Sequence, residues 1–286
     1  MTEFGARLRV ALDTHGPLCV GIDPHAHLLD QWGMDADAAG VREFGMRVVE
    51  AAAGRVGVVK PQVAFFERFG SAGFAALEDV MAAARAAGLL VIADAKRGDI
   101  GTTMDGYAAA WFEPGSPLEA DALTVSPYLG PDSLRATLTT AVRHGKGVFV
   151  LAATSNPEAA ALQTARTVDV ASTDDQTVAE RVARDVSWVN GSAAFDGGLG
   201  PIGLVVGATV DRHEFGLTDA ALRGAPLLAP GFGAQGASPA DLHRLFGALS
   251  PNVVASESRS ILSAGSDALA ARIEERAALY RRGSDA

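Results

Sequence analysis

Eight short apolar runs recur along the chain, and longer alanine-rich amphipathic segments separate them. The runs cover residues 18–23, 56–60, 89–94, 122–126, 147–153, 202–207, 226–229 and 252–256. Near-continuous apolar runs of this kind are typical of strands buried on both faces of a parallel sheet. The segments between them have the length of crossover helices, about ten residues or more. A further helical segment at 3–14 precedes the first run, so the chain is predicted to consist of repeated βα units.

Eight βα units in 286 residues favour a closed (β/α)8 TIM barrel, an α/β fold in a single domain over residues 1–286. With 48% hydrophobic residues, the chain can bury one large core, so a second domain is not required. An open doubly wound sheet is the alternative, because the spacing of the runs does not give the strand order. The longest interruption, at about residues 156–176, is rich in Ser, Thr and Asp, and we interpret it as an active-site loop or lid.

The overall composition limits the kinds of function that this chain can have. A formal net charge of -10 argues against non-specific nucleic-acid binding, although a local cluster of Lys and Arg could still bind an anionic substrate. Cys19 is the single cysteine, so no intramolecular disulfide can form. The N-terminal residues lack the apolar core of a signal peptide, and no apolar run approaches the roughly 18 residues of a membrane span. We therefore expect a soluble cytoplasmic protein with neither nucleic-acid nor membrane partners.

The segment that follows the third run concentrates acidic and basic side chains. Residues 94–103 read Asp-Ala-Lys-Arg-Gly-Asp-Ile-Gly-Thr-Thr. The strand period of two places Asp94 and Lys96 on the same side, with Asp99 just beyond the strand end. The glycines allow a turn, after which Thr102 or Thr103 is expected to cap a helix. A surface ion pair would explain an isolated Asp-x-Lys, but the longer string D-x-K-x-x-D-I-x-x-T is far more specific.

Polar residues also follow the ends of other runs. In a barrel of this kind the chemistry lies at the carboxyl ends of the strands, so these residues are expected to meet at one mouth. They include Asp23, Lys60, Ser155, Gln235, Ser258 and Arg259. Each of them taken alone is an ordinary solvated loop residue. Their shared placement after strands favours a common site.

A glycine-rich stretch follows the seventh run. Residues 231–236 read Gly-Phe-Gly-Ala-Gln-Gly, which matches the G-x-G-x-x-G pattern of dinucleotide-binding folds. That fingerprint normally opens the first βαβ unit of its domain, whereas this stretch comes late in the chain. Loops after the seventh and eighth strands of barrels commonly bind phosphate. We interpret the stretch as a phosphate site, with Gly233, Gln235 and Arg259 as donors; a glycine-rich turn without a ligand is the alternative.

His25 and His27 follow the first run in an H-x-H arrangement, which is similar to the metal site of amidohydrolase barrels. Such a site also needs histidines after the fifth and sixth runs, and the fifth run is followed by Ser155 and Asn156. The sequence assembles no convincing metal-ligand set. We therefore predict that the two histidines are solvated loop residues and that the site holds no metal.

Taken together, these motifs closely resemble the orotidine 5'-phosphate decarboxylase family, in particular its longer bacterial subgroup. The resemblance covers most of the chain. It implies that four charged residues form a catalytic tetrad of alternating sign: Lys60, Asp94, Lys96 and Asp99. It also implies substrate-binding roles for Asp23, Ile100, Thr103, Ser155, Gly233, Gln235, Ser258 and Arg259. The sequence departs from the family pattern at Phe232 in the phosphate loop and at Ser258, where a glycine often precedes the arginine.

The resemblance implies conversion of orotidine 5'-phosphate to UMP, the last step of de novo UMP biosynthesis, without a cofactor. Loss of carbon dioxide from a carbon with no adjacent electron sink leaves a localised carbanion, which Lys96 would stabilise and protonate. The family also implies a homodimer with shared active sites, in which Asp99, Ile100 and Thr103 reach the partner subunit's site. A magnesium-dependent sugar-phosphate enzyme and a catalytically silent nucleotide-binding protein stay open as alternatives.

Overall fold

The computed structural model describes residues 3–167, 175–192 and 198–284. At its centre, eight parallel strands form a closed barrel in the order β1-β10-β9-β8-β5-β4-β3-β2. The strands are β1 (Leu18–Ile22), β2 (Val58–Pro61), β3 (Leu90–Arg97), β4 (Ala122–Val125), β5 (Gly147–Ala153), β8 (Ile202–Val206), β9 (Leu227–Pro230) and β10 (Val253–Glu257). Each lies on one of the eight apolar runs, so the single-domain (β/α)8 barrel is confirmed and the open sheet is excluded.

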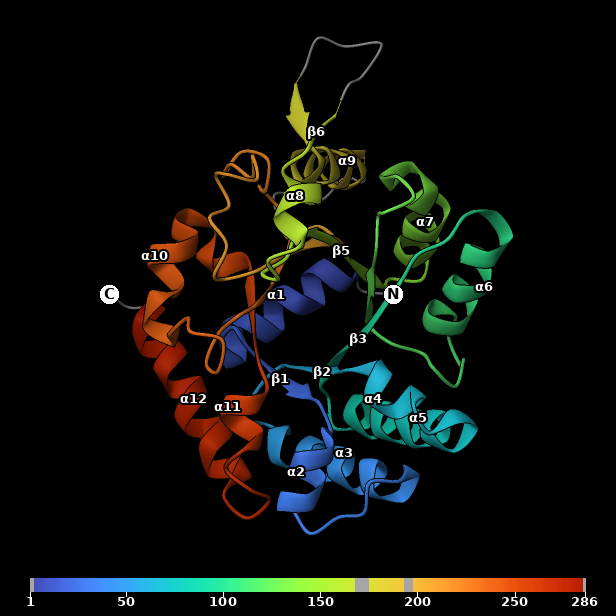
Figure 1. The fold of residues 1–286 in the computed structure, drawn as a ribbon, viewed down its shortest axis with the longest axis vertical. Helices are drawn as coiled ribbons and strands as arrows, with labels where there is room; N and C mark the ends of the chain where they lie inside the picture. Colours follow the sequence, from blue (N-terminus) through green and yellow to red (C-terminus); the bar gives the residue numbers. More distant parts are fainter. Residues whose placement is uncertain (1–2, 168–174, 193–197, 285–286) are drawn as a thin grey trace.

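Helices surround the barrel on its outer side (Figure 1). The longer ones are α3 (Ala38–Ala52), α5 (Gly70–Ala86), α6 (Gly101–Phe112), α7 (Arg135–Arg143), α9 (Val178–Ser192) and α12 (Leu269–Ser284). Short helices are α2 (Ala26–Gln31), α4 (Val63–Glu67), α8 (Ala159–Gln163), α10 (Leu242–Phe246) and α11 (Arg259–Leu262), with 3-10 turns η1 (Pro131–Leu134), η2 (Pro239–Asp241) and η3 (Gly247–Asn252). None of the helices in the described ranges is long and apolar enough to cross a membrane.

The remaining helix, α1 (Phe4–His15), closes the end of the barrel at which the strands begin. Its apolar residues Phe4, Leu8 and Leu12 are buried against inward-facing strand residues. Its Arg7 donates to the carboxylate of Asp121, which precedes β4, and to the carbonyl of Gly145, which precedes β5. Helix α1 therefore acts as a plug for this end of the barrel.

Close packing around the plug requires a small residue at the start of β5. The Phe4 ring meets the Phe149 ring edge-on, with centroids 6.1 Å apart. A Cβ on Gly147 would lie 2.2 Å from the Phe4 ring, closer than any real contact. Glycine at this position thus lets an aromatic ring enter the barrel.

Two local predictions are wrong. A helical crossover was expected between β8 and β9, but residues 208–224 form a series of turns. The Asp211 carboxylate there accepts the His213 N–H, a local bond that competes with helix formation, and Gly216 adopts a φ of +72°. The expected threonine cap of α6 is also absent: Ile100 occupies the cap position without a side-chain bond, and the Asp99 carboxylate accepts the Ile100 N–H instead.

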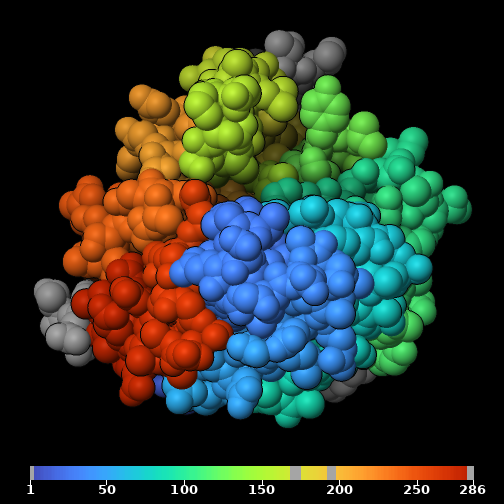
Figure 2. Space-filling view, turned by 60° about the horizontal axis from the view of Figure 1, so that its bottom comes forward, coloured from blue at the N-terminus to red at the C-terminus, as the bar shows by residue number. Residues whose placement is uncertain are grey.

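The long interruption between β5 and α9 contains local structure in its described part. It forms the short helix α8 and a two-stranded antiparallel sheet, β6 (Arg166–Thr167) with β7 (Gln176–Thr177). Figure 2 shows the yellow-green residues of this segment projecting from the surface, while the N-terminal region (blue) lies beside the C-terminal helix (red). Residues 168–174 lie outside the described residues. The role of the segment as an active-site loop stays a prediction.

Candidate active site

A cavity of about 640 Å³ opens at the carboxyl ends of the barrel strands. Eight of the predicted site residues line it: Asp23, Lys60, Asp94, Lys96, Ser155, Gln235, Ser258 and Arg259. They come from strands or strand ends around the whole barrel, as the rule for βα loops leads one to expect. Apolar side chains of Leu151, Val205 and Leu228 complete the wall. The cavity therefore combines an apolar wall with several charged groups, the usual make-up of a small-molecule site.

A chain of alternating charges lies along one side of this cavity. The Asp94 carboxylate pairs with two lysines. Its Oδ2 lies 2.8 Å from the Lys60 ammonium nitrogen, and its Oδ1 lies 2.5 Å from the Lys96 ammonium nitrogen. Lys60 and Asp94 are buried, whereas 46% of the Lys96 side chain is exposed. The buried pair thus anchors the array, and the Lys96 ammonium is the member that a bound molecule can reach.

The pKa values of the buried pair move in opposite directions. Burial alone raises the pKa of Asp94, but the two lysine charges outweigh it and hold this pKa well below its usual range. Burial alone lowers the pKa of Lys60, but Asp94 and then Asp23 outweigh it and raise this pKa. At neutral pH both groups therefore stay ionised, and the array keeps its alternating charges.

The backbone of Lys96 is unusual. Its φ is +48°, and it is the one non-glycine residue with a positive φ in the described parts of the chain. The pairing of β3 with β4 changes register between Ala93 and Arg97, so Lys96 sits in an irregular part of the strand. Such conformations cluster at functional sites, because the surrounding structure must hold them in place.

Two cavity-lining residues in contact with this array were not predicted from the sequence. Thr124, in β4, is buried and bonds to both Asp94 and Lys96. The available signal was a hydroxyl side chain inside the fourth apolar run. Gln62, after β2, also lines the cavity, and its side-chain oxygen lies 3.5 Å from the Lys60 ammonium.

Two buried polar atoms of the cavity residues have no hydrogen-bond partner among the described residues: Asp23 Oδ1 and Ser258 Oγ. Buried polar atoms are nearly always satisfied, so unpaired ones in a cavity are available to a bound molecule. Asp23 follows β1 and Ser258 follows β10, and these two strands are neighbours in the barrel. This side of the cavity therefore offers a carboxylate and a hydroxyl to a ligand.

The glycine-rich stretch forms a tight loop after β9. Gly231, Gly233 and Gly236 have φ values of +119°, +71° and +113°, which explains why glycine stands at each position. The Gly233 N–H donates to the Ala237 carbonyl and is therefore already used within the loop. Ala234 and Gln235 line the cavity, whereas Gly233 does not.

Three further predicted residues also lie outside the cavity lining: Asp99, Ile100 and Thr103. They belong to the turn after β3 and the start of α6. Asp99 is half-buried and Thr103 is exposed, as is 61% of Ile100. Within one chain, Asp99 therefore does not line the cavity together with the other three members of the predicted tetrad.

Both histidines after β1 were predicted to be solvated loop residues; His27 is exposed, in the first turn of α2, whereas His25 differs from the prediction. Both line the cavity, and His25 is half-buried with its ring 4.2 Å from the Phe65 ring. Burial lowers the pKa of His25, and the charges of His27 and Arg259 act in the same direction, against the opposing charge of Asp23. Among the described residues, no group of three His, Cys, Asp or Glu side chains is placed to hold a metal ion.

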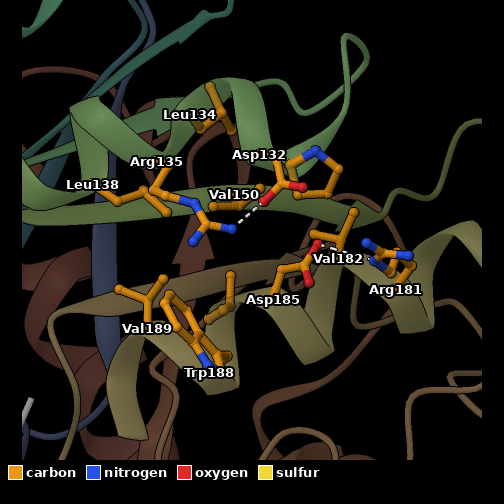
Figure 3. Close-up of a pocket in the computed structure, with 12 residues that line it drawn as sticks. Asp132, Leu134, Arg135, Leu138, Val150, Arg181, Val182, Asp185, Trp188 and Val189 are labelled. Carbon is orange, nitrogen blue, oxygen red and sulfur yellow. Dashed lines mark hydrogen bonds and ion pairs between the residues drawn. The ribbon is translucent and has the colours of Figure 1, made fainter. Parts of the chain in front are cut away.

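A second cavity, of about 230 Å³, lies between α7 and α9 on the outside of the barrel (Figure 3). Its charged residues are engaged with one another, as the ion pairs Asp132–Arg135 and Arg181–Asp185 show. The Arg135 guanidinium also lies 4.9 Å from the centroid of the Trp188 ring. This cavity has no cluster comparable with the lysine–aspartate array, so the cavity at the strand ends is the candidate active site.

Comparisons with known proteins agree with this geometry. The model of the Orotidine 5'-phosphate decarboxylase / HUMPS family matches residues 16–273. Orotidine 5'-phosphate decarboxylase of Salinispora tropica is 53% identical over 274 residues, 95% of this chain and 94% of the relative. The Streptomyces coelicolor enzyme is 52% identical over 272 residues, with the same coverage. A Streptomyces avermitilis crystal structure assigned to this activity has a TM-score of 0.92 and 49% identity, covering 100% of this chain and 97% of that one. The chain therefore belongs to the Orotidine 5'-phosphate decarboxylase / HUMPS family.

Proposed function

We propose that this protein decarboxylates orotidine 5'-phosphate to UMP in the cytoplasm, without a cofactor. The single observation that carries the proposal is the Lys60–Asp94–Lys96 array on one side of a cavity with an apolar wall. Relatives about half identical over nearly the whole chain carry this activity in their names. The same activity makes the chain an enzyme of the carboxy-lyase class.

The array suits a reaction that passes through a localised carbanion. When the bond between C6 of the pyrimidine and the carboxylate breaks, carbon dioxide leaves and the electron pair stays on C6. The Lys96 ammonium stabilises this charge and then transfers a proton to C6, which leaves a neutral amine that solvent reprotonates. Asp94 holds the ammonium in place and repels the substrate carboxylate in the ground state, a repulsion that ends when carbon dioxide departs.

The remaining cavity residues divide into subsites for the rest of the nucleotide. We assign the ribose hydroxyls to Asp23 and Lys60, because Asp23 Oδ1 is buried and unpaired within the described structure. We assign the pyrimidine amide edge to Ser155. The 5'-phosphate is assigned to Gln235, Ser258 and Arg259, since Arg259 supplies a cation and the Ser258 hydroxyl is unpaired in the described residues. The structure favours Ala234 and Gln235 over Gly233 as the parts of the loop that meet the ligand.

We further propose a homodimer in which Asp99, Ile100 and Thr103 complete the site of the partner subunit. In support, these residues follow the end of β3, the strand that carries Asp94 and Lys96, but they do not line the cavity of their own chain. The loops after the neighbouring strands β3 and β4 carry exposed apolar side chains, with Ile100, Tyr128 and Leu129 exposed by 61%, 76% and 53%. Apolar side chains gathered at such a place are typical of a protein interface.

The proposal is tested by following orotidine 5'-phosphate consumption by ultraviolet absorbance in the presence of a chelator. We expect full conversion to UMP without added metal. Strict magnesium dependence would contradict the proposal and favour the sugar-phosphate alternative. Binding of UMP without turnover of orotidine 5'-phosphate would instead identify a silent nucleotide-binding protein.

A further inference from the structure

Thr124 connects the two residues at the centre of the array. Its hydroxyl donates to Asp94 Oδ1 at 2.9 Å and accepts the backbone N–H of Lys96, also at 2.9 Å. The residue is 1% exposed, so water does not compete for these bonds. A hydroxyl has one proton to donate, and here that proton goes to the carboxylate.

The bond to the Lys96 N–H holds the strained part of β3. Because the β3–β4 register changes between Ala93 and Arg97, the regular ladder is interrupted at Lys96. The Thr124 hydroxyl supplies the acceptor that the Lys96 N–H needs, in a residue with φ of +48°. This bond ties the backbone of Lys96 to the neighbouring strand β4, so Thr124 stabilises the backbone turn that carries the lysine side chain.

The bond to Asp94 fixes the rotation of its carboxylate. Oδ1 accepts both the Thr124 hydroxyl and the Lys96 ammonium, while Oδ2 accepts the Lys60 ammonium. Thr124, Asp94 and Lys96 therefore form a closed hydrogen-bonded ring, which passes through the backbone and the side chain of the lysine. Loss of the hydroxyl would leave the Lys96 N–H without this acceptor and would remove one of the bonds that orient the Asp94 carboxylate, to which the ammonium binds.

We propose that Thr124 is a positioning residue that orients the Asp94 carboxylate and thereby sets the place of the Lys96 ammonium. The inference rests on the proposed decarboxylase function and deepens it. Thr124 is not part of the proposed phosphate subsite, because it lies on β4 whereas Gln235 and Arg259 follow β9 and β10. Its removal is therefore expected to affect turnover more than nucleotide binding.

The test compares three variants with the wild type. Thr124→Val has nearly the same shape and lacks the hydroxyl, and Thr124→Ser restores the hydroxyl. Thr137→Val is the matched control, because Thr137 in α7 is fully buried and its hydroxyl has no hydrogen-bond partner among the described residues. We expect Thr124→Val to lower kcat by about 10- to 100-fold with the Kd for UMP changed by less than about threefold. Thr124→Ser should recover most of kcat, and Thr137→Val should leave it unchanged.

Two readouts separate positioning from a general loss of stability. The first is the fall in kcat with an unchanged Kd for UMP, which should be reversed in Thr124→Ser, because Thr124 acts on the placement of the Lys96 ammonium and not on the nucleotide. Amide hydrogen exchange at Lys96 should accelerate in Thr124→Val only. Wild-type kcat in Thr124→Val, or equal losses in both valine variants, would overturn the inference. An inactive wild type would refute the proposed function, and Lys96 exchange would then decide the positioning role by itself.

Discussion

A methyl group placed on Gly233 would lie 2.7 Å from carboxylate Oε2 of Glu257. The loop after β9 therefore rests directly on a carboxylate that has no exposed surface. That carboxylate accepts hydrogen bonds from Ser260, from Arg276 through two nitrogens, and from the Tyr280 hydroxyl. The Phe232 ring of the same loop meets the Tyr280 ring edge-on, with centroids 5.6 Å apart. Glu257 thus joins the proposed phosphate loop to the last barrel strand and to the C-terminal helix.

Gly233→Ala is expected to raise the KM for orotidine 5'-phosphate by about tenfold or more, because the new methyl group displaces the loop from Glu257 and Ser260. Gly54→Ala is the matched control: Gly54 has a φ of +72°, against +71° for Gly233, and open space around its Cβ position. Both variants should lose about 1 kcal/mol of stability from the strained φ. Steady-state kinetics should separate them, and an unchanged KM in Gly233→Ala would contradict the phosphate role of the loop.

Glu257→Gln is expected to lower the free energy of unfolding by about 2–3 kcal/mol, because the Arg276 guanidinium loses its charged partner in a buried setting. Tyr280→Phe removes the hydrogen bond from the Tyr280 hydroxyl to Glu257 and should cost about 1 kcal/mol. Glu43→Gln serves as the control, since its pairing with Arg47 is exposed and should contribute less than about 0.5 kcal/mol. Urea unfolding measures all three, and equal effects of Glu257→Gln and Glu43→Gln would show that the network is unimportant.

Lys96→Ala should abolish turnover and spare nucleotide binding. The variant loses both the cation beside the developing carbanion and the proton donor, so kcat should fall by at least about 10⁴-fold. Gln235 and Arg259 remain, and the Kd for UMP measured by calorimetry should stay within about threefold of the wild-type value. Activity close to that of the wild type would mean that the array is not the catalytic centre.

Asp94→Asn should change how stability depends on pH. The pKa of Asp94 is lowered in the folded protein, so its contribution to stability is complete above the unfolded pKa of about 3.9 and is lost as the pH falls below it. The variant lacks this contribution and leaves the buried Lys60 without its partner, at a cost of about 3–5 kcal/mol near neutral pH. The difference between wild type and variant in urea unfolding should therefore shrink below about pH 4. A difference that grows in acid would contradict the ionised state of Asp94.

A mixture of the Lys96→Ala and Asp99→Ala variants tests the proposed homodimer with shared active sites. Each parent should be nearly inactive, because every site lacks one member of the tetrad. Subunit exchange should make about half of the dimers hybrid, and one site in each hybrid would carry neither lesion, so roughly a quarter of wild-type activity should return. Mass spectrometry verifies the exchange. If exchange occurs and the activity stays absent, Asp99 acts within its own chain.

The barrel itself could be predicted because each strand is a buried apolar run, a local property that survives without knowledge of the partner strand. The crossover after β8 could not, since the bond from the His213 N–H to Asp211 and the glycine at position 216 favour turns over a weak helical pattern. Eight residues that line the cavity could be predicted from their position at strand ends, because a closed parallel barrel brings all of these ends together.

The backbone conformation of Lys96 could not be predicted from the sequence. The positive φ of Lys96 arises from a register change against β4, which depends on tertiary pairing and not on the residues of β3 alone. Thr124 was missed for a related reason, because its apolar neighbours in β4 made it resemble a core residue. Its role depends on its distance from Asp94 and Lys96, which lie about 30 positions earlier in the chain.

The plug formed by α1 determines the route by which substrate and products enter and leave the barrel. Phe4, Leu8 and Leu12 fill the barrel at the end opposite the cavity, which leaves the mouth at the strand ends as the route to solvent through the barrel. Substrate must arrive by this route, and carbon dioxide and UMP must leave by it. Carbon dioxide formed near Lys96 therefore leaves on the same side of the barrel at which the nucleotide enters.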